Sequence, residues 1–407
     1  MRNLLFVAVS SLALVACGTN DAEENTDTTT AQAEPAEDYG YETYDEDNLA
    51  DTMASNDDAQ GMGDSVARED QDIPDSQDRP IMQAQVVLDR IGFGPGVIDG
   101  KMGMSTENAL NGFQEANGLD VTGQLDEATK TALSDWDSIP ATRVVTIPVS
   151  WGDAEYRSIP EETAAKAEME SLGYRSLDER LAERFHTTVD VLKELNPGGQ
   201  PAGASEDDGP NSQATPTPDV ERPDGEEPSY FQAGQQIRVP NIGGDRIEKG
   251  KIGDRNWQRT LASLGVGSDQ PEVNRIVVSK AGKTLKAYQG DKLVALFTVS
   301  SGSSEFPLPL GEWDILGEAY NPPYSYDPKV LSGGKEDGKE YMLPPGPNSP
   351  VGVIWIDLSK EHYGIHGTPE PETIGRAQSS GCVRLTNWDA ARLAGMVSQS
   401  TQVIFEA

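Results

Sequence analysis

The sequence has little positive charge. Its 407 residues contain 32 Lys and Arg against 68 Asp and Glu, and the formal net charge is −36. Binding to the phosphates of nucleic acids needs clustered Lys and Arg, so we expect no nucleic-acid partner. The acid is concentrated in residues 19–80, with 20 Asp and Glu against Arg68 and Arg79, and in residues 201–228, with eight against Arg222. These compositions predict two solvated segments without a core.

Cysteine and histidine are also scarce, with two and three copies. Cys17 and Cys382 lie at opposite ends of the chain in different surroundings, and each has a better explanation than a shared disulfide. The spacing of His362, His366 and Cys382 allows a zinc site, but Gly364 argues against the helix that would place both histidines on one face. We therefore predict no metal and no cofactor.

The chain has one long apolar run, residues 4–16, after a positively charged start. The run is too short to span a bilayer but suits a secretory signal. It ends at Cys17 in a Leu-Val-Ala-Cys stretch that resembles a bacterial lipobox, in which the cysteine is acylated. The resemblance implies export to the periplasm and anchoring through acylated Cys17, in the outer membrane if the source is Gram-negative. Residues 1–17 are thus predicted to be a lipoprotein signal peptide and residues 18–79 a disordered acidic tether.

Residues 80–137 have the apolar spacing of a three-helix module. Gly92 is expected to end the first helix, and Thr106 and Asp126 to cap the second and third. The stretch resembles the peptidoglycan-binding domain type 1 at Leu88, Gly92-Phe93, Ile98-Asp99-Gly100, Gly103, Thr106, Ala109-Leu110, Phe113-Gln114, Gly118-Leu119 and Thr122-Gly123. The resemblance implies cell-wall glycan and stem peptides as partners. The alternative is a three-helix spacer without a ligand.

Residues 138–245 are less regular. The pattern predicts a strand, two helices and a second strand, at residues 143–149, 177–185, 189–195 and 234–240. This order is similar to a LysM domain, a small glycan-binding fold, although residues 201–228 insert an acidic loop with six prolines. His186 follows the first helix and is expected to be structural or at the surface.

Residues 271–407 are predicted to form a β-rich domain, which makes the fold class multidomain α+β. The expected strands are residues 275–279, 284–288, 293–299, 351–356 and 402–405, and the expected helix is 389–396. Trp355 and Trp388 are expected in the core, His362 at a rim, and residues 320–326 near a substrate groove. Residues 335–339 and 344–350 are expected to form a mobile flap and its base.

Two motifs in this domain carry chemistry: Tyr363-Gly364-Ile365-His366-Gly367-Thr368 and Ser379-Ser380-Gly381-Cys382-Val383-Arg384-Leu385. A free thiol has a pKa of about 8.5, and a neighbouring imidazole can take its proton and hold the pair as thiolate and imidazolium. Gly381 permits a tight turn, where backbone N–H groups, including that of Ser380, can stabilise an oxyanion. Arg384 can meet a substrate carboxylate or brace the turn.

Both motifs are very similar to those of the YkuD-type L,D-transpeptidase catalytic domain, over residues 273–407. The resemblance implies that Cys382 is the nucleophile and His366 the general base and acid. It places four further residues at the substrate, namely Tyr363, Gly367, Thr368 and Ser379. Ser380 departs from the common pattern, which has His there, so His366 would do all the acid–base work.

The reaction that the resemblance implies is transfer of a peptidoglycan stem peptide through a thioester. An amine acceptor gives a 3–3 cross-link or an exchanged stem end, and water gives L,D-carboxypeptidase activity. Two other classes stay open. One is a weak or inactive lipoprotein that tethers the membrane to the wall, which Ser380 and the long tether allow. The other is an unrelated cysteine protease, for which no Asn or Asp partner motif is present.

Overall fold

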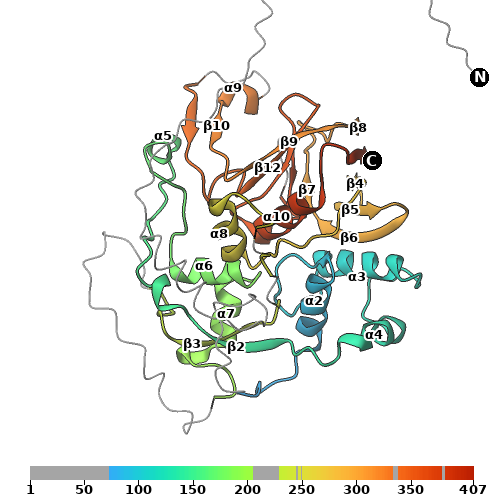
Figure 1. Cartoon of the computed structure of the whole chain (residues 1–407), viewed down its shortest axis with the longest axis vertical. Coiled ribbons are helices and arrows are strands. Elements are labelled where there is room, and N and C mark those ends of the chain that lie inside the picture. Colours follow the sequence, from blue (N-terminus) through green and yellow to red (C-terminus); the bar gives the residue numbers. More distant parts are fainter. Residues whose placement is uncertain (1–72, 205–228, 244–245, 249, 333–337, 378–380) are drawn as a thin grey trace, which may run out of the picture. The chain divides into compact units, whose positions relative to one another are not determined.

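The computed structural model describes residues 73–204, 229–243, 246–248, 250–332, 338–377 and 381–407 (Figure 1). The predicted signal peptide with Cys17, most of the tether, most of the acidic insert and Ser379-Ser380 lie outside these residues. Among the helices of the described ranges, none is long and apolar enough to cross a membrane. We name three parts: the helical region (73–136), the middle region (137–243) and the C-terminal region (246–407).

The helical region contains the three predicted helices. Its elements are α2 (Pro80–Arg90), β1 (Phe93–Gly94), α3 (Met104–Ala116), α4 (Glu127–Leu133) and the 3-10 turn η1 (Ser134–Trp136). Asp126 caps α4 as predicted, because its carboxylate accepts the Thr129 backbone N–H over 2.9 Å. The prediction that Thr106 caps α3 is wrong. Gly103 takes the cap position, and the Thr106 hydroxyl is buried inside the helix, where it accepts from the Gln85 amide over 3.0 Å.

The middle region has the predicted strand–helix–helix–strand order. Its elements are β2 (Thr142–Thr146), η2 (Val149–Trp151), α5 (Thr163–Lys166), α6 (Leu177–Arg184), α7 (Val189–Leu195), η3 (Pro197–Gly199) and β3 (Gln236–Pro240). β2 and β3 pair in antiparallel orientation around the helices. β2 is shorter than predicted, because Pro148 leads into the turn η2 and leaves Val149 exposed. The LysM resemblance stays a prediction.

Residues 73–79 were expected to belong to the tether, but they fold against the middle region. The Arg238 side chain is only 2% exposed. Its guanidinium donates to the carbonyl of Ile73 over 2.7 Å and lies 3.9 Å from the Asp75 carboxylate. A buried cation is costly without acceptors, and this segment supplies them. The prediction of disorder is therefore wrong for residues 73–79.

The C-terminal region is β-rich, as predicted. Its elements are α8 (Arg255–Leu264), β4 (Arg275–Ser279), β5 (Thr284–Gln289), β6 (Lys292–Thr298), β7 (Ser300–Ser301), β8 (Gly311–Trp313), β9 (Ile315–Tyr320), β10 (Tyr324–Tyr326), α9 (Pro328–Leu331), β11 (Tyr341–Leu343), β12 (Ile354–Leu358), β13 (Gly364–His366), η5 (Pro371–Thr373), β14 (Val383–Arg384), α10 (Asn387–Met396) and β15 (Gln402–Glu406). The strand expected over 351–356 starts only at Ile354, because Gly352 has a positive φ of 61°.

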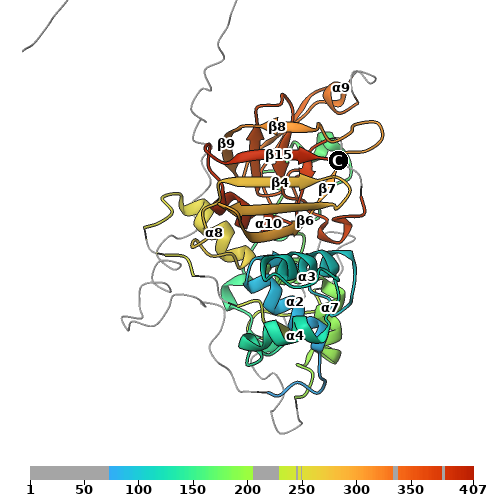
Figure 2. The same cartoon turned by 90° about the vertical axis from the view of Figure 1, so that its right-hand side faces the viewer.

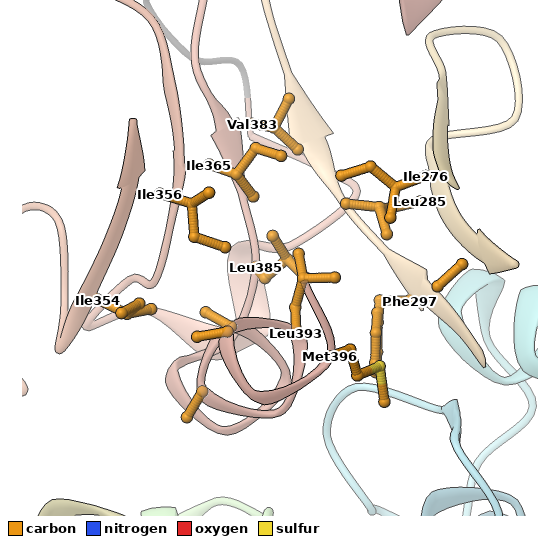
Figure 3. Close-up of a cluster of buried hydrophobic side chains, with 14 of the residues drawn as sticks. Ile276, Leu285, Phe297, Ile354, Ile356, Ile365, Val383, Leu385, Leu393 and Met396 are labelled. Carbon is orange, nitrogen blue, oxygen red and sulfur yellow. The ribbon is translucent and has the colours of Figure 1, made fainter. Parts of the chain in front are cut away.

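Two sheets enclose the core of this region. One has the order β1-β6-β5-β4-β15-β8 and the other β7-β14-β13-β12-β9. Figure 3 shows Ile276 and Leu285 of the first sheet opposite Ile356 and Ile365 of the second, with Leu393 of α10 beside them. All five side chains are fully buried. Burying each contributes roughly 1.5–3 kcal/mol, so this core fixes where the two sheets lie.

The helical region packs on one edge of the first sheet. β1 pairs in parallel with β6, with Phe93 opposite Leu296, and α3 lies along the same strand (Figure 2). The Leu296 N–H donates to the Gly92 carbonyl over 3.1 Å. The edge strand of the C-terminal region is therefore covered by a strand from a part of the chain about 200 residues earlier.

A buried charge cluster joins all three regions. Asp89 of α2 accepts two hydrogen bonds from the Arg392 guanidinium of α10, over 3.0 and 3.1 Å. It also lies 3.2 Å from Nδ1 of His186, which follows α6, and Nε2 of His186 lies 2.8 Å from the carbonyl of Leu264. His186 is fully buried and stacks on Trp388. His186 was expected to be either structural or at the surface, and its burial supports the structural role.

Candidate active site

Two neighbouring strands carry the predicted catalytic pair. β13 and β14 run parallel, with Ile365 paired to Val383 and His366 paired to Arg384. Ile365 and Val383 are fully buried and point into the core (Figure 3). Because side chains alternate along a strand, His366, Arg384 and Cys382 lie on the opposite face. Cys382 comes two residues before Arg384, the partner of His366, so Cys382 and His366 are diagonal neighbours on that face.

His366 is held in one orientation. Its ring stacks on the Trp355 indole, with 5.5 Å between the ring centroids, and Nδ1 lies 2.7 Å from the Gly367 carbonyl. A carbonyl can only accept, so Nδ1 carries the proton and Nε2 is left with a lone pair. Burial lowers the pKa of His366 to about 4, with a smaller contribution from the charge of Arg384. The imidazole is therefore neutral near pH 7.

The thiol of Cys382 lies over the backbone that leads into β13. Its Sγ donates to the His362 carbonyl over 3.7 Å. Burial raises the pKa of the Cys382 thiol, while a hydrogen bond from the Gly364 backbone N–H and the charge of Arg384 act in the opposite direction. With the imidazole also neutral, the resting pair is thiol and imidazole. The alternative form, the thiolate–imidazolium pair that the sequence allows, is disfavoured at rest because burial disfavours both charged forms.

Gly381 forms the turn before Cys382, as predicted. Its φ is +108°, a conformation that residues with a Cβ rarely adopt. A Cβ there would also collide with the ring of Tyr363. Tyr363 therefore lies against the turn that presents Cys382. Ser379 and Ser380 belong to the segment outside the described residues, so their predicted roles stay predictions.

Arg384 follows Cys382 by two residues and is within electrostatic range of both Cys382 and Glu370. Burial lowers the pKa of Arg384, and the charges of Glu370 and Cys382 raise it. Its positive charge is thus stabilised by Glu370 and by a charged form of Cys382. This placement is compatible with both predicted roles, a contact to a substrate carboxylate and a brace of the turn.

A hairpin of β10 and β11 brings Tyr324 to the site. Burial raises the pKa of Tyr324 to about 12, and the charge of Cys382 contributes in the same direction, which places the phenol near the thiol. The sequence predicted only that residues 320–326 lie near the groove. The base of the hairpin is fixed by the middle region: the Leu172 N–H donates to the Pro345 carbonyl over 2.8 Å, and the Asn348 N–H to the Leu172 carbonyl over 3.0 Å.

The two tryptophans have different places. Trp388 is fully buried, which confirms its prediction as a core residue. Trp355 was also expected in the core, but it is only partly buried and lies on the catalytic face, stacked on His366. The alternation along β12 explains the difference, because Ile354 and Ile356 take the core positions on either side. His362 is exposed, as expected for a rim residue.

Gly367 and Thr368 have structural roles in addition to any contact with substrate. The Gly367 carbonyl accepts from His366, and the buried Thr368 hydroxyl accepts the Glu370 N–H over 3.3 Å. Their predicted substrate contacts stay predictions. Within the described ranges, no group of three or more His, Cys, Asp and Glu suits a metal ion.

A thiol and an imidazole of fixed tautomer on one face of a small sheet place this protein with the enzymes that act through a cysteine nucleophile. The family model described as "L,D-transpeptidase catalytic domain" matches residues 273–405, and that described as "Putative peptidoglycan binding domain" matches residues 77–133. The matches correspond to the C-terminal and helical regions.

Curated relatives agree with this class. The "Putative L,D-transpeptidase YkuD" of Bacillus licheniformis is 30% identical over 164 residues, which are 40% of this chain and 79% of the relative. A Fuscovulum blasticum protein, "Putative L,D-transpeptidase in ATP synthase subunits region ORF 5", is 41% identical over 147 residues, 36% of this chain and 73% of its own. The chain belongs to the YkuD-type L,D-transpeptidase family.

Among solved structures, "L,D-transpeptidase from Mycobacterium smegmatis" is 22% identical and covers 33% of this chain and 59% of its own, with a TM-score of 0.28. This score is too low to add to the assignment.

Proposed function

We propose that this enzyme transfers peptidoglycan stem peptides through a thioester on Cys382. The sulfur attacks the carbonyl of the third residue of a tetrapeptide stem, and the bond to the terminal D-alanine breaks. An amine from a second stem then attacks the thioester, forms a 3–3 cross-link and releases the thiol. An amino acid as acceptor would exchange the stem end, and water would give a tripeptide. The observation that carries the proposal is the placement of Cys382 and His366 on one face of adjacent strands, in a chain of this family.

Proton movement follows from the tautomer of His366. Nε2 accepts the thiol proton as sulfur attacks, and the resulting imidazolium is stabilised by the Gly367 carbonyl at Nδ1. The imidazolium gives its proton to the departing D-alanine amine. In the second half, the neutral imidazole takes a proton from the acceptor amine and returns one to the sulfur. Because both groups are neutral at rest, the proton moves during the attack itself.

We also propose that the enzyme works at the cell wall. The helical region, which matches a peptidoglycan-binding family, would hold glycan strands, and the LysM-like middle region would add to this. Acylated Cys17 would anchor the exported chain to a membrane, with the acidic segment as its tether. Both substrates would then lie within reach of an anchored enzyme.

The test is incubation of the full chain with a purified disaccharide-tetrapeptide, followed by mass spectrometry. We expect a cross-linked dimer, a tripeptide or an acyl-enzyme, and Cys382→Ala should abolish all three. His366→Ala should lose activity, whereas His362→Asn, the matched control at the exposed rim, should retain it. Unchanged turnover in Cys382→Ala would exclude the proposed mechanism. A wild-type chain that binds peptidoglycan but gives none of these products would favour the tethering role.

A further inference from the structure

Asn387, the first residue of α10, is fully buried behind the catalytic face and does not belong to the Cys382–His366 pair. Its amide nitrogen donates to the Glu183 carboxylate over 2.7 Å and to the Pro347 carbonyl over 3.1 Å. Its amide oxygen accepts the Val353 N–H over 3.3 Å. Both amide hydrogens are used, so the side chain has one orientation.

The oxygen of this amide is packed against the residue that orients the catalytic base. A Cβ on Gly367 would collide with Oδ1 of Asn387, so the Gly367 backbone touches the amide directly. The carbonyl of Gly367 in turn fixes Nδ1 of His366 over 2.7 Å. The Asn387 side chain therefore restricts the position of the Gly367 backbone. The Gly367 carbonyl in turn fixes the tautomer and the orientation of the His366 ring.

The acceptor that holds Asn387 comes from another part of the chain. Glu183 lies on α6 of the middle region, 204 residues away in sequence, and is 9% exposed. Its carboxyl group is close to Tyr174 and Glu179 of the same region, and burial raises the pKa of Glu183 to about 7. Protonated or ionised, one carboxyl oxygen remains available to accept from Asn387.

We propose that Glu183 and Asn387 are positioning residues for His366, and that the middle region thereby completes the active site of the C-terminal region. The inference rests on the proposed role of His366 as the base. Without the Glu183 acceptor, Asn387 loses a buried hydrogen bond and can turn away from Gly367. A displacement of about 1 Å of a catalytic group lowers rates about 10²-fold, so even a small shift of the imidazole is measurable.

The test compares Glu183→Ala with Glu183→Gln in the full chain. We expect Glu183→Ala to slow acyl-enzyme formation about 10- to 100-fold while KM changes less than about twofold. Glu183→Gln keeps an acceptor oxygen and should stay within about twofold of wild type. Glu194→Ala, an exposed glutamate of α7, is the matched control. Circular dichroism and thermal melting verify that each variant is folded.

A rescue pair covers the case in which Glu183→Ala does not fold. Asn387→Asp removes the N–H groups that donate to Glu183 and to the Pro347 carbonyl, so this variant should be slow. Adding Glu183→Gln supplies an N–H donor from the other side of the pair and should recover part of the rate. Wild-type rates in Glu183→Ala, a loss confined to KM, or the absence of any rescue would overturn the proposal.

A second readout separates this proposal from the proposed function. Alkylation by iodoacetamide, measured on the peptide that contains Cys382, needs no stem-peptide substrate and should follow the same order of variants. If wild type turns over no tetrapeptide, the proposed function fails while the alkylation rates still decide the positioning role. Equal alkylation rates in all variants would refute the positioning role even if turnover were normal.

Discussion

The buried pair of Asp89 and Arg392 allows a quantitative prediction about how the three regions hold together. Asp89 is fully buried, and Arg392 is 3% exposed and donates to both oxygens of its carboxylate. Burial alone would raise the pKa of Asp89, but the charges of Arg392 and His186 outweigh it and hold the pKa below its ordinary value. Asp89 is thus a buried anion, and each member of the Asp89–Arg392 pair is the main counter-charge of the other.

Asp89→Ala would leave the Arg392 guanidinium buried without its main counter-charge. Removing one partner of such a pair costs about 3–5 kcal/mol, which corresponds to a fall in Tm of roughly 5–8 °C for a protein of this size. The assay is urea and thermal unfolding followed by circular dichroism, and the matched control is the same substitution at an exposed aspartate, Asp135→Ala. Arg392→Met in the Asp89→Ala background should recover part of the loss, because the uncompensated charge is then absent.

The same perturbation tests whether the regions unfold together. Since Asp89, His186 and Arg392 come from three regions, we expect the wild-type protein to unfold in one transition and Asp89→Ala to show a separate, earlier transition of the helical region. A variant that unfolds in one step within about 1 kcal/mol of wild type would refute the reasoning, because a buried pair cannot be broken at so small a cost.

Two further predictions concern the site. Gly346→Ala would place a Cβ against the Leu172 carbonyl, so we expect it to release the hairpin that carries Tyr324 and to lower turnover more than stability, measured by paired kinetics and melting curves. His366 has a folded pKa of about 4 against 6.5 in the unfolded chain, so its contribution to stability is present above pH 6.5 and is lost as pH falls toward 4. Urea unfolding should show that the free energy of unfolding falls between pH 7 and pH 4 by about 3 kcal/mol less in His366→Gln than in wild type. An equal fall in both proteins would contradict this prediction.

Local patterns in the sequence predicted much of the fold. The helices α6 and α7 lie within one residue of their predicted bounds, because apolar periodicity and the caps Ser176 and Thr188 are encoded within a few residues. The proposed catalytic pair could also be found from the sequence, since Cys382 and His366 lie in short motifs. Alternation along the strands explains why these two share a face once β13 and β14 pair.

Contacts between distant segments were not predictable in this way. Nothing around Asn387 indicates that its partner is Glu183, and nothing near Phe93 and Gly94 marks them as an added strand for β6. Trp355 was misplaced because a tryptophan in an apolar strand looks the same whether it faces the core or an imidazole. These features depend on tertiary pairing, which leaves no periodic signal along the chain.

The parallel pairing of β1 with β6 has a consequence for the solubility of the enzyme. An uncovered edge strand presents a row of free N–H and C=O groups, and such strands invite other chains to add to the sheet. Here a two-residue strand and the helix α3 occupy that edge. The helical region, which matches a peptidoglycan-binding family, therefore also protects the sheet from self-association. A fragment cut down to the two sheets of the C-terminal region would expose the edge of β6 to other chains.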